Sequence, residues 1–196
     1  MHSRNPVPNL PLEEIKRCTD ILRSGGILLY PTDTVWGLGC DATNAKAVEK
    51  IFELKQRPEA KSMIVLLDQP SLLNKYVQEV PGVAWDMVEL AEDPLTIIYD
   101  DVKGMAANVL ASDGSCGIRI TRDEFCRRLI RQLGRPLVST SANISSQPAP
   151  AIFDEVTAAI KEGVDHIADW RLHDQHRAKP SKIIRLKNNG EVKIIR

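Results

Sequence analysis

One short stretch constrains what this chain can fold into more than any other. Residues 27–30 (Ile-Leu-Leu-Tyr) form an apolar run between glycine and Pro31, which is typical of a strand buried on both faces. Pro31 lacks a backbone N–H and ends regular pairing. The polar segment from Thr32 to Gly39 follows, with glycines that permit a positive φ or a close approach of the backbone to a ligand. Ligands of α/β sheets bind at such strand ends, so the stretch predicts a binding loop, with a polar turn as the structural alternative.

Helices and strands alternate along the rest of the chain. Helical periodicity predicts helices over residues 12–22, 45–55, 72–91 with a break at Pro81-Gly82, 123–133 and 152–161. Apolar runs predict strands over residues 63–67, 95–99, 117–120, 137–139, 164–168, 181–186 and 192–195. Asn44 is suited to cap the second helix, and Asn189-Gly190 predicts a hairpin between the last two strands. We therefore expect a single α/β domain with a mixed sheet over residues 1–196, preceded by a polar extension over residues 1–10.

The charge and cysteine content argue against several classes of protein. Lys and Arg number 26 and Asp and Glu number 26, so no global basic field favours non-specific binding of nucleic acid. A local basic patch stays open, because Arg127, Arg128, Arg131 and Arg135 lie close together in the sequence. The 4 cysteines lack CxxC spacing, which disfavours zinc binding and favours free thiols in a reducing compartment. No signal peptide or membrane-spanning run is present, so we expect a cytoplasmic protein without membrane contacts.

Three cations follow the second predicted helix. Lys55, Arg57 and Lys61 lie just before a predicted buried strand. Arg offers a planar fork to phosphate oxygens and Lys a point charge, so the segment suits a phosphate clamp. The alternative is compensation of the helix dipole on a solvated turn. The usual motifs of nucleotide and hydrolase sites are missing from the sequence, so a nucleotide would bind by another geometry.

Two further segments place polar groups at the ends or centres of strands. The strand at residues 137–139 runs into Ser139, Ser141 and Asn143, which could donate to phosphate or carboxylate oxygens or simply form a turn. Arg119 lies between two isoleucines in a short strand and should point opposite to both. It would then face either a cleft, where it suits a substrate carboxylate, or the solvent.

Three blocks taken together resemble the signature of the YrdC-like family. They are residues 30–39 (Tyr-Pro-Thr-Asp-Thr-Val-Trp-Gly-Leu-Gly), 55–58 (Lys-Gln-Arg-Pro) and 139–143 (Ser-Thr-Ser-Ala-Asn). The resemblance covers nearly the whole chain and matches the single-domain form of the family. It implies an open, twisted mixed α/β sheet with flanking helices around a positively lined cavity. It also implies L-threonylcarbamoyladenylate synthase activity: L-threonine, bicarbonate and ATP would give threonylcarbamoyl-AMP and pyrophosphate, for threonylcarbamoyladenosine modification of tRNA next to the anticodon.

The resemblance also implies roles for particular residues. ATP would be bound by Lys55, Arg57, Lys61, Ser115, Ser141, Asn143 and Arg196, and threonine by Thr32, Arg119, Ser139 and Ser181. Arg119 would hold the carboxylate of threonine, while Lys55 and Arg57 would act electrostatically, with no protein nucleophile. Mg²⁺ would arrive with ATP, without a protein ligand. Expected partners beyond these substrates are tRNA or the proteins of the later transfer step.

The main alternative is a module of the same fold that binds double-stranded RNA or tRNA without synthase activity. The arginines between Arg127 and Arg135 would supply its basic face, although the zero net charge disfavours it. The chain also departs from the family pattern at two places. It has Glu92-Asp93-Pro94 where relatives often carry Pro-Gly-Pro, and Lys182 follows Ser181 where relatives often have Glu-Ser-Thr.

Overall fold

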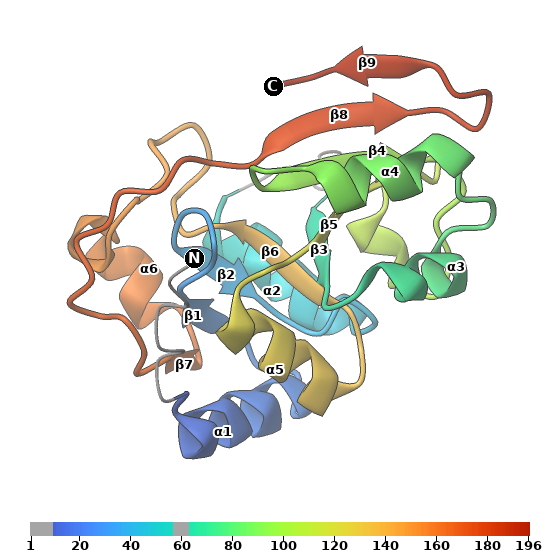
Figure 1. The fold of residues 1–196 in the computed structure, drawn as a ribbon. Helices are drawn as coiled ribbons and strands as arrows, with labels where there is room; N and C mark the ends of the chain where they lie inside the picture. The colour runs from blue at the N-terminus through green and yellow to red at the C-terminus, as the bar shows by residue number, and fades with distance from the viewer. Residues whose placement is uncertain (1–9, 57–62) are drawn as a thin grey trace.

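The computed structural model describes residues 10–56 and 63–196. Strands of this part of the chain form one nine-stranded mixed sheet in the order β7-β1-β2-β6-β3-β5-β4-β8-β9. The strands are β1 (Leu28–Tyr30), β2 (Gly37–Gly39), β3 (Ile64–Leu67), β4 (Leu95–Tyr99), β5 (Cys116–Ile120), β6 (Leu137–Ser141), β7 (His166–Ile167), β8 (Lys182–Leu186) and β9 (Val192–Ile194). Three strand pairs are parallel (β1 with β7, β3 with β5, β4 with β8) and the other pairs are antiparallel, and the sheet ends in separate edges at β7 and β9. The predicted open, mixed α/β sheet is confirmed (Figure 1).

Two helices cover part of one face of the sheet. α1 (Leu12–Arg23) and α5 (Glu124–Leu133) lie side by side below it in Figure 1. Their apolar faces pack with β-strand side chains such as Tyr30, Leu66 and Leu137 in one buried cluster. α5 forms here because its apolar residues recur at helical spacing and Asp123 accepts a hydrogen bond from the backbone N–H of Cys126. These helices leave the rest of the same face uncovered.

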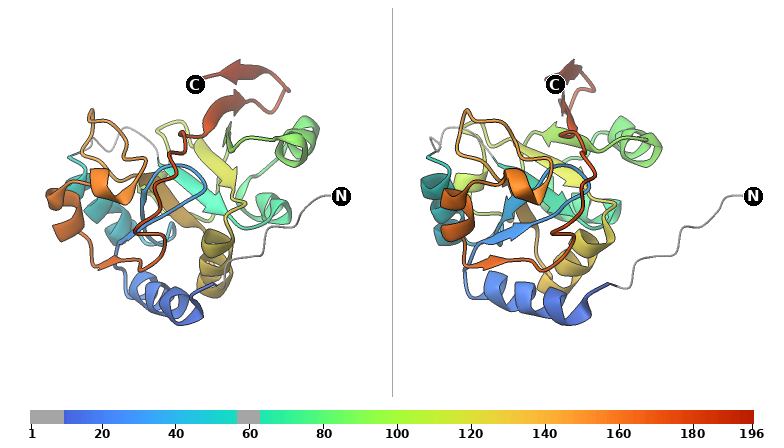
Figure 2. Two further views of the ribbon diagram at one scale, coloured as in Figure 1. Left: turned by 60° about the vertical axis from the view of Figure 1, so that its left-hand side comes forward. Right: turned by 90° about the vertical axis from the view of Figure 1, so that its left-hand side faces the viewer.

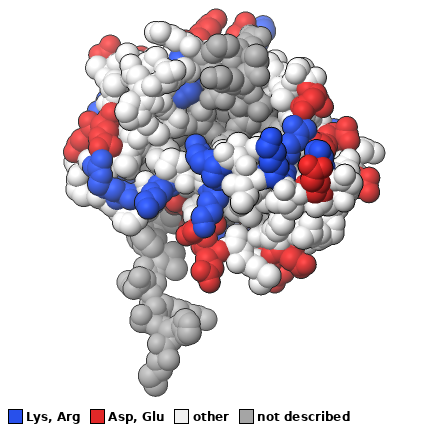
Figure 3. Space-filling view, turned by 90° about the horizontal axis from the view of Figure 1, so that it is seen from above, with Lys and Arg blue, Asp and Glu red and all other residues white. Residues whose placement is uncertain are grey.

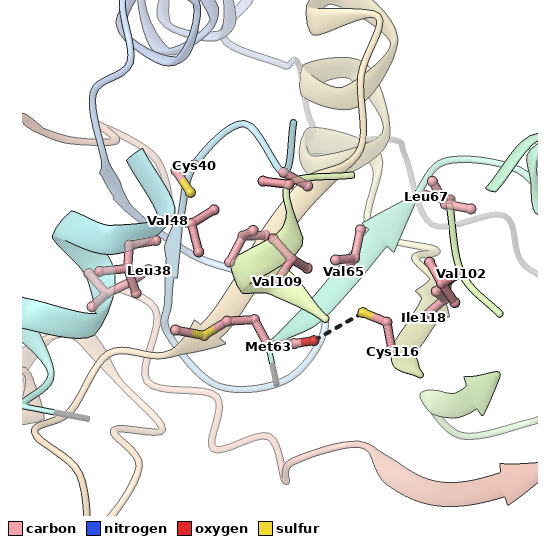
Figure 4. Packing of buried hydrophobic residues seen from close by; sticks show 14 of the residues in the cluster. Leu38, Cys40, Val48, Met63, Val65, Leu67, Val102, Val109, Cys116 and Ile118 are labelled. Carbon is pink, nitrogen blue, oxygen red and sulfur yellow. Dashed lines mark hydrogen bonds between the residues drawn. The ribbon is translucent and has the colours of Figure 1, made fainter. Parts of the chain in front are cut away.

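The opposite face carries the larger hydrophobic cluster. Its helices are α2 (Ala45–Leu54), α3 (Leu73–Tyr76), α4 (Gly82–Leu90) and α6 (Ala158–Glu162), with short 3₁₀ turns η1 (Pro70–Leu72), η2 (Ala107–Val109) and η3 (Phe153–Glu155). Figure 4 shows Val48 and Val109 packed against Leu38, Val65 and Ile118 of the strands. Asn44 caps α2 as predicted, since its side-chain oxygen accepts from the backbone N–H groups of two following residues.

The C-terminal hairpin stands apart from these layers. β8 and β9 form it at one edge of the sheet (Figure 2), across a turn in which Gly190 has a φ of +86°. The predicted hairpin is confirmed. All 4 cysteines are buried and free, as the sequence predicts. Within residues 10–56 and 63–196, no helix combines the length and the apolar content that crossing a membrane requires.

Several predicted elements are wrong in detail. The helix predicted over residues 152–161 is two short pieces, η3 and α6, because the backbone at Val156 and Thr157 between them is extended. The ring of Phe153 packs on Trp36 with the two centroids 5.0 Å apart. Residues 77–81 are also not helical, since Val77 instead bridges to Val102.

The glycines after the first buried strand are part of a strand rather than a loop. Gly37 and Gly39 belong to β2, which pairs antiparallel with β1. Neither has a positive φ. A Cβ at Gly39 would lie 2.6 Å from the ring of Tyr30 and 2.9 Å from the carbonyl oxygen of Val138, so Gly39 is required by packing. Gly37, in contrast, borders the cavity described next.

Candidate active site

The pairing register brings several predicted site residues to one face of the sheet. Arg119 of β5 lies opposite Thr96 of β4, and Ile64 of β3 lies between Gly117 of β5 and Ser139 of β6. Because side chains alternate along a strand, these residues share the face that α1 and α5 cover only in part. A cavity of about 280 Å³ occupies the uncovered area. Its lining includes Gly37, Thr96, Arg119, Ser139, Ser141, Ser181 and Arg196.

Arg119 is the buried cation of this cavity. The residue is 3% exposed, so the alternative of a solvent-facing arginine is wrong. One terminal nitrogen, Nη1, pairs with Asp33, and Nη2 donates to Thr34 Oγ1 at 3.4 Å. The lining described for this cavity contains no Asp or Glu. A buried guanidinium without a second acidic neighbour in the cavity suits an anionic ligand.

Hydroxyl groups surround Arg119 on three strands or strand ends. Ser139 and Ser181 line the cavity and are 7% and 6% exposed. The hydroxyl of Ser181 is 2.8 Å from that of Thr96. Thr96 was not among the predicted residues, although the alternation of residues 95–99 places it on the same face as Arg119 once the two strands pair.

Thr32 is outside the described lining of this cavity, although a Cβ at Gly37, which borders the cavity, would lie 3.4 Å from the Thr32 methyl group. Its hydroxyl accepts from the backbone N–H of Thr34 and donates to the carbonyl of Val35, each at 2.9 Å. These bonds hold the loop between β1 and β2. Thr32 lines a neighbouring cavity together with Arg171, whose guanidinium donates to the carbonyl of Thr32 at 2.8 Å. Its proposed contact with threonine therefore stays a prediction, while its contact with the loop is observed.

Of the three cations predicted to form a phosphate clamp, the structure describes only Lys55. Arg57 and Lys61 lie outside the described residues. Lys55 is 2% exposed, which contradicts the alternative of a solvated turn for this residue. Its ammonium group donates to the carbonyl of Asn143 at 2.7 Å and to that of Ser141. Lys55 thus ties the end of α2 to the end of β6, at the border of the cavity.

Asn143 stabilises the loop after β6. Its side-chain nitrogen donates to the carbonyl of Gln147 at 2.6 Å and to that of Ile144 at 3.0 Å. The side-chain oxygen is buried without a hydrogen-bond partner among the described residues. Ser141 reaches the cavity from the last position of β6. The predicted serine–asparagine pair is therefore adjacent to Lys55, as a shared site requires.

Ser115 points to a carboxylate rather than to the cavity. Its hydroxyl donates to Asp113 Oδ1 at 2.6 Å, and its backbone N–H donates to the same atom at 3.0 Å. Together with Arg185, these bonds lower the pKa of the Asp113 carboxyl to about 2. The described cavity lining does not include Ser115. Its contact with the nucleotide stays a prediction.

Arg196 reaches the cavity because the chain forms a bulge directly after β9 ends at Ile194. The backbone N–H groups of Ile195 and Arg196 both donate to the carbonyl of Ile183, so two residues lie opposite one. Strict alternation predicts opposite faces for Ile195 and Arg196, and this prediction is wrong: both line the cavity. The guanidinium of Arg196 donates to the carbonyl of Ser181 through Nε at 3.3 Å and Nη2 at 3.1 Å.

Deleting Arg196 should raise the apparent KM for ATP about tenfold, because one charge-assisted contact with phosphate is lost. The free energy of unfolding should change by less than about 0.5 kcal/mol, since Arg196 is exposed and adds no side chain to the core. Initial rates at limiting ATP and a denaturant titration measure the two quantities. Full activity at limiting ATP would show that the terminal arginine takes no part in binding.

The residues at the two departures from the family pattern contact each other. Lys182 Nζ lies 2.7 Å from Asp93 Oδ2, and the backbone N–H of Lys182 donates to the carbonyl of Pro94 at 3.0 Å. The hydrogen bond and charge of Lys182 lower the pKa of the Asp93 carboxyl. The unusual lysine therefore pairs with the unusual aspartate at the start of the β4–β8 pair, outside the described lining of the cavity.

One group of side chains in the described structure has the composition of a metal site. Glu14, Cys18 and His166 offer ligand atoms within 4.8 Å of one another. Glu14 Oε1 is 2.6 Å from His166 Nε2 and accepts from the backbone N–H of Asp169 at 3.0 Å. Burial raises the pKa of the Cys18 thiol well above its usual range. These contacts account for the group as a link between α1 and β7.

A mixed sheet with a buried arginine and several hydroxyls around a cavity defines an α/β protein whose cavity suits a small anionic ligand. The Sua5/YciO/YrdC family model, described as "Telomere recombination", matches residues 20–196, and the chain belongs to this family. The threonylcarbamoyl-AMP synthase of Idiomarina loihiensis is 36% identical over 168 residues, which are 84% of this chain and 89% of the relative. That of Hahella chejuensis is 34% identical over 171 residues, 86% of this chain and 91% of the relative.

Solved structures have the same fold. Sua5 of P. abyssi in complex with L-threonine has a TM-score of 0.76 and 27% identity over 88% of this chain and 50% of that chain. This chain therefore spans about half the length of that Sua5. YciO of E. coli has a TM-score of 0.82 and 24% identity over 96% of this chain and 90% of that chain, which establishes the fold alone.

Proposed function

We propose that this chain is an L-threonylcarbamoyladenylate synthase. The observation that carries the proposal is the buried guanidinium of Arg119 in a cavity lined by Ser139 and Ser181. A guanidinium binds a carboxylate, and hydroxyls can pair with the amine and hydroxyl of threonine. The similarity to threonylcarbamoyl-AMP synthases over most of the chain supports the same assignment.

The proposed reaction needs positioned charge more than a nucleophilic side chain. Bicarbonate and the amine of threonine give N-carboxythreonine, whose new carboxylate attacks the α-phosphorus of ATP as pyrophosphate leaves. The enzyme is accordingly a nucleotidyltransferase that orients two substrates and neutralises phosphate charge. Arg119 would hold the threonine carboxylate, and Arg196 and Ser141 the phosphates. Lys55 would act beside them through the loop it anchors, together with Arg57 and Lys61.

In this proposal Mg²⁺ arrives bound to the triphosphate of ATP. The described lining offers guanidinium and hydroxyl groups and no Asp or Glu side chain, which suits phosphate oxygens better than a bare divalent cation. When bound, the ion would neutralise charge on the phosphates. The product would serve threonylcarbamoyladenosine formation in tRNA, with tRNA or transfer proteins as partners in the cytoplasm.

The direct test is the release of pyrophosphate from ATP by the purified chain. Release should depend on both L-threonine and bicarbonate, because neither alone forms the attacking carboxylate. Omitting each in turn provides the internal control. Release that continues without threonine would instead indicate an ATP pyrophosphatase.

The amino-acid selectivity should follow from the hydroxyl-lined cavity. Serine lacks one methyl group and should show a kcat/KM about 10- to 200-fold below that of threonine. Valine should be poorer still, because it leaves the hydroxyls of the site unpaired. Pyrophosphate release with the three amino acids at equal concentration measures this order. Valine turnover equal to that of threonine would contradict the assignment of this cavity to threonine.

The ion pairs of α5 disfavour the alternative of an RNA-binding module. Arg131 lies 2.8 Å from Asp68 and Arg135 lies 2.6 Å from Asp41, while Arg127 and Arg128 both contact Glu124. Three carboxylates thus offset most of the charge of the four arginines that would form the basic face. Figure 3 shows a row of Lys and Arg on another face, with Asp and Glu beside it at several points. Neither arrangement gives the unbroken basic surface that a nucleic-acid backbone favours.

A further inference from the structure

Asp33 lies behind Arg119, outside the described lining of the cavity that contains Arg119. It comes from the loop between β1 and β2, and its side chain is 17% exposed. Oδ1 pairs with Arg119 Nη1, and Oδ2 accepts from the hydroxyl of Thr121 at 3.3 Å and the backbone N–H of Arg122 at 3.4 Å. The carboxylate is thus fixed by donors from β5 and the segment that follows it. A group held in this way can fix the orientation of its own partner.

The other N–H groups of Arg119 have a long hydrogen bond or no acceptor among the described residues. Nη2 has only the long contact of 3.4 Å with Thr34, and Nε is buried without a partner among the described residues. A guanidinium binds a carboxylate best through two parallel N–H groups. With Nη1 occupied by Asp33, the pair formed by Nε and Nη2 is left for a ligand. A buried N–H without an acceptor destabilises the protein, and a bound carboxylate would supply that acceptor.

We propose that Asp33 is a positioning residue that holds the Arg119 guanidinium so that its Nε and Nη2 groups face the substrate carboxylate. This inference rests on the proposed function, which makes that substrate threonine. Without Asp33 the arginine side chain regains rotamer freedom, and binding must then restrict it again. Asp33 acts through Arg119 and needs no contact with the substrate.

The charge of Asp33 taken alone predicts the opposite effect of its removal. A carboxylate on one side of the guanidinium repels a second carboxylate on the other side. If charge were its only role, removing it would strengthen threonine binding. If positioning dominates, removing it weakens binding, so the sign of the change separates the two roles.

The experiment measures the Kd of L-threonine by calorimetry for wild type, Asp33→Asn and Asp33→Ala. Asparagine keeps one acceptor for Nη1 and should weaken binding about threefold. Alanine keeps none and should weaken it about tenfold or more. The Kd of ATP should stay within about twofold in both variants, since a local change of Arg119 does not reach the phosphates. Asp68→Ala is the matched control: it removes a buried carboxylate from an ion pair with Arg131, away from the cavity, and should leave the threonine Kd unchanged.

The outcomes separate the inference from the proposed function. No binding of threonine to the wild type would overturn the proposed function itself. Threonine binding by the wild type, with equal or tighter binding by both Asp33 variants, would overturn the positioning role alone. Parallel loss of ATP and threonine binding would also overturn it, because general disruption would then explain the result. If Asp33→Ala fails to fold, Asp33→Asn still decides the sign.

Discussion

Replacing Arg119 by glutamine is expected to lower kcat/KM for L-threonine by about 100- to 1,000-fold, which corresponds to roughly 2.7–4 kcal/mol of lost transition-state binding. The reason is that Arg119 is the buried cation of the cavity, and glutamine offers neither its charge nor its paired donors. Pyrophosphate release as a function of threonine concentration measures the change. The apparent KM for ATP should move far less, because the arginine is assigned to the amino acid.

The matched control for this variant is Arg122→Gln. Arg122 is exposed, lies close to Arg119 in the sequence and borders a different cavity. Its replacement should leave kcat/KM for threonine within about twofold. Melting curves of both variants check that the fold persists, since Arg119→Gln also leaves Asp33 without its ion-pair partner. A folded Arg119→Gln enzyme with nearly normal kcat/KM for threonine would remove Arg119 from the site.

The second large effect is expected for Lys55→Ala. This substitution should lower the free energy of unfolding by about 2–4 kcal/mol, because it removes a charged donor from the carbonyls of Ser141 and Asn143 and also removes a buried side-chain stem. It should also weaken ATP binding, since the loop after β6 would lose one of its anchors while keeping the bond from the backbone N–H of Ser145 to the carbonyl of residue 55. Denaturant unfolding and ATP calorimetry measure the two changes.

Lys46→Ala tests whether the effect belongs to the buried position. Lys46 lies on the same helix, α2, but is exposed. Its replacement should change the unfolding free energy by less than about 0.5 kcal/mol. If Lys55→Ala proved as stable as Lys46→Ala, the contacts of Lys55 with the two carbonyls would contribute little to the fold.

The sequence predicts much of the fold because its signals are local. Apolar runs identify eight of the nine strands, and the caps and breakers locate the main helices. The sequence does not predict β2, because Gly37-Leu38-Gly39 has little intrinsic strand preference. This segment becomes a strand only by pairing with β1 and β6. The break in the helix predicted over residues 152–161 is also missed, because the extended backbone at Val156 and Thr157 leaves the helical spacing of the apolar residues unchanged.

The residues of the candidate site also divide into those that the sequence predicts and those that it does not. Arg119, Ser139 and Ser181 could be selected from sequence because strand alternation and strand ends decide where such side chains point. Ser115 could not be judged, because its hydrogen bond to Asp113 depends on the local turn. The position of Arg196 depends on a bulge opposite Ile183, and the types of the terminal residues do not predict that bulge.

By itself, the sequence determined the alternation of helices and strands, the apolar faces that meet in the core, and the residue types available for an anionic ligand. Only the tertiary structure decided which groups are partners: Asp33 with Arg119, Lys55 with the loop after β6, and Asp93 with Lys182. The physical reason is the separation along the chain over which each interaction acts. Periodicity and capping act over a few residues, whereas an ion pair forms only where the sheet register brings distant segments to within a few ångströms.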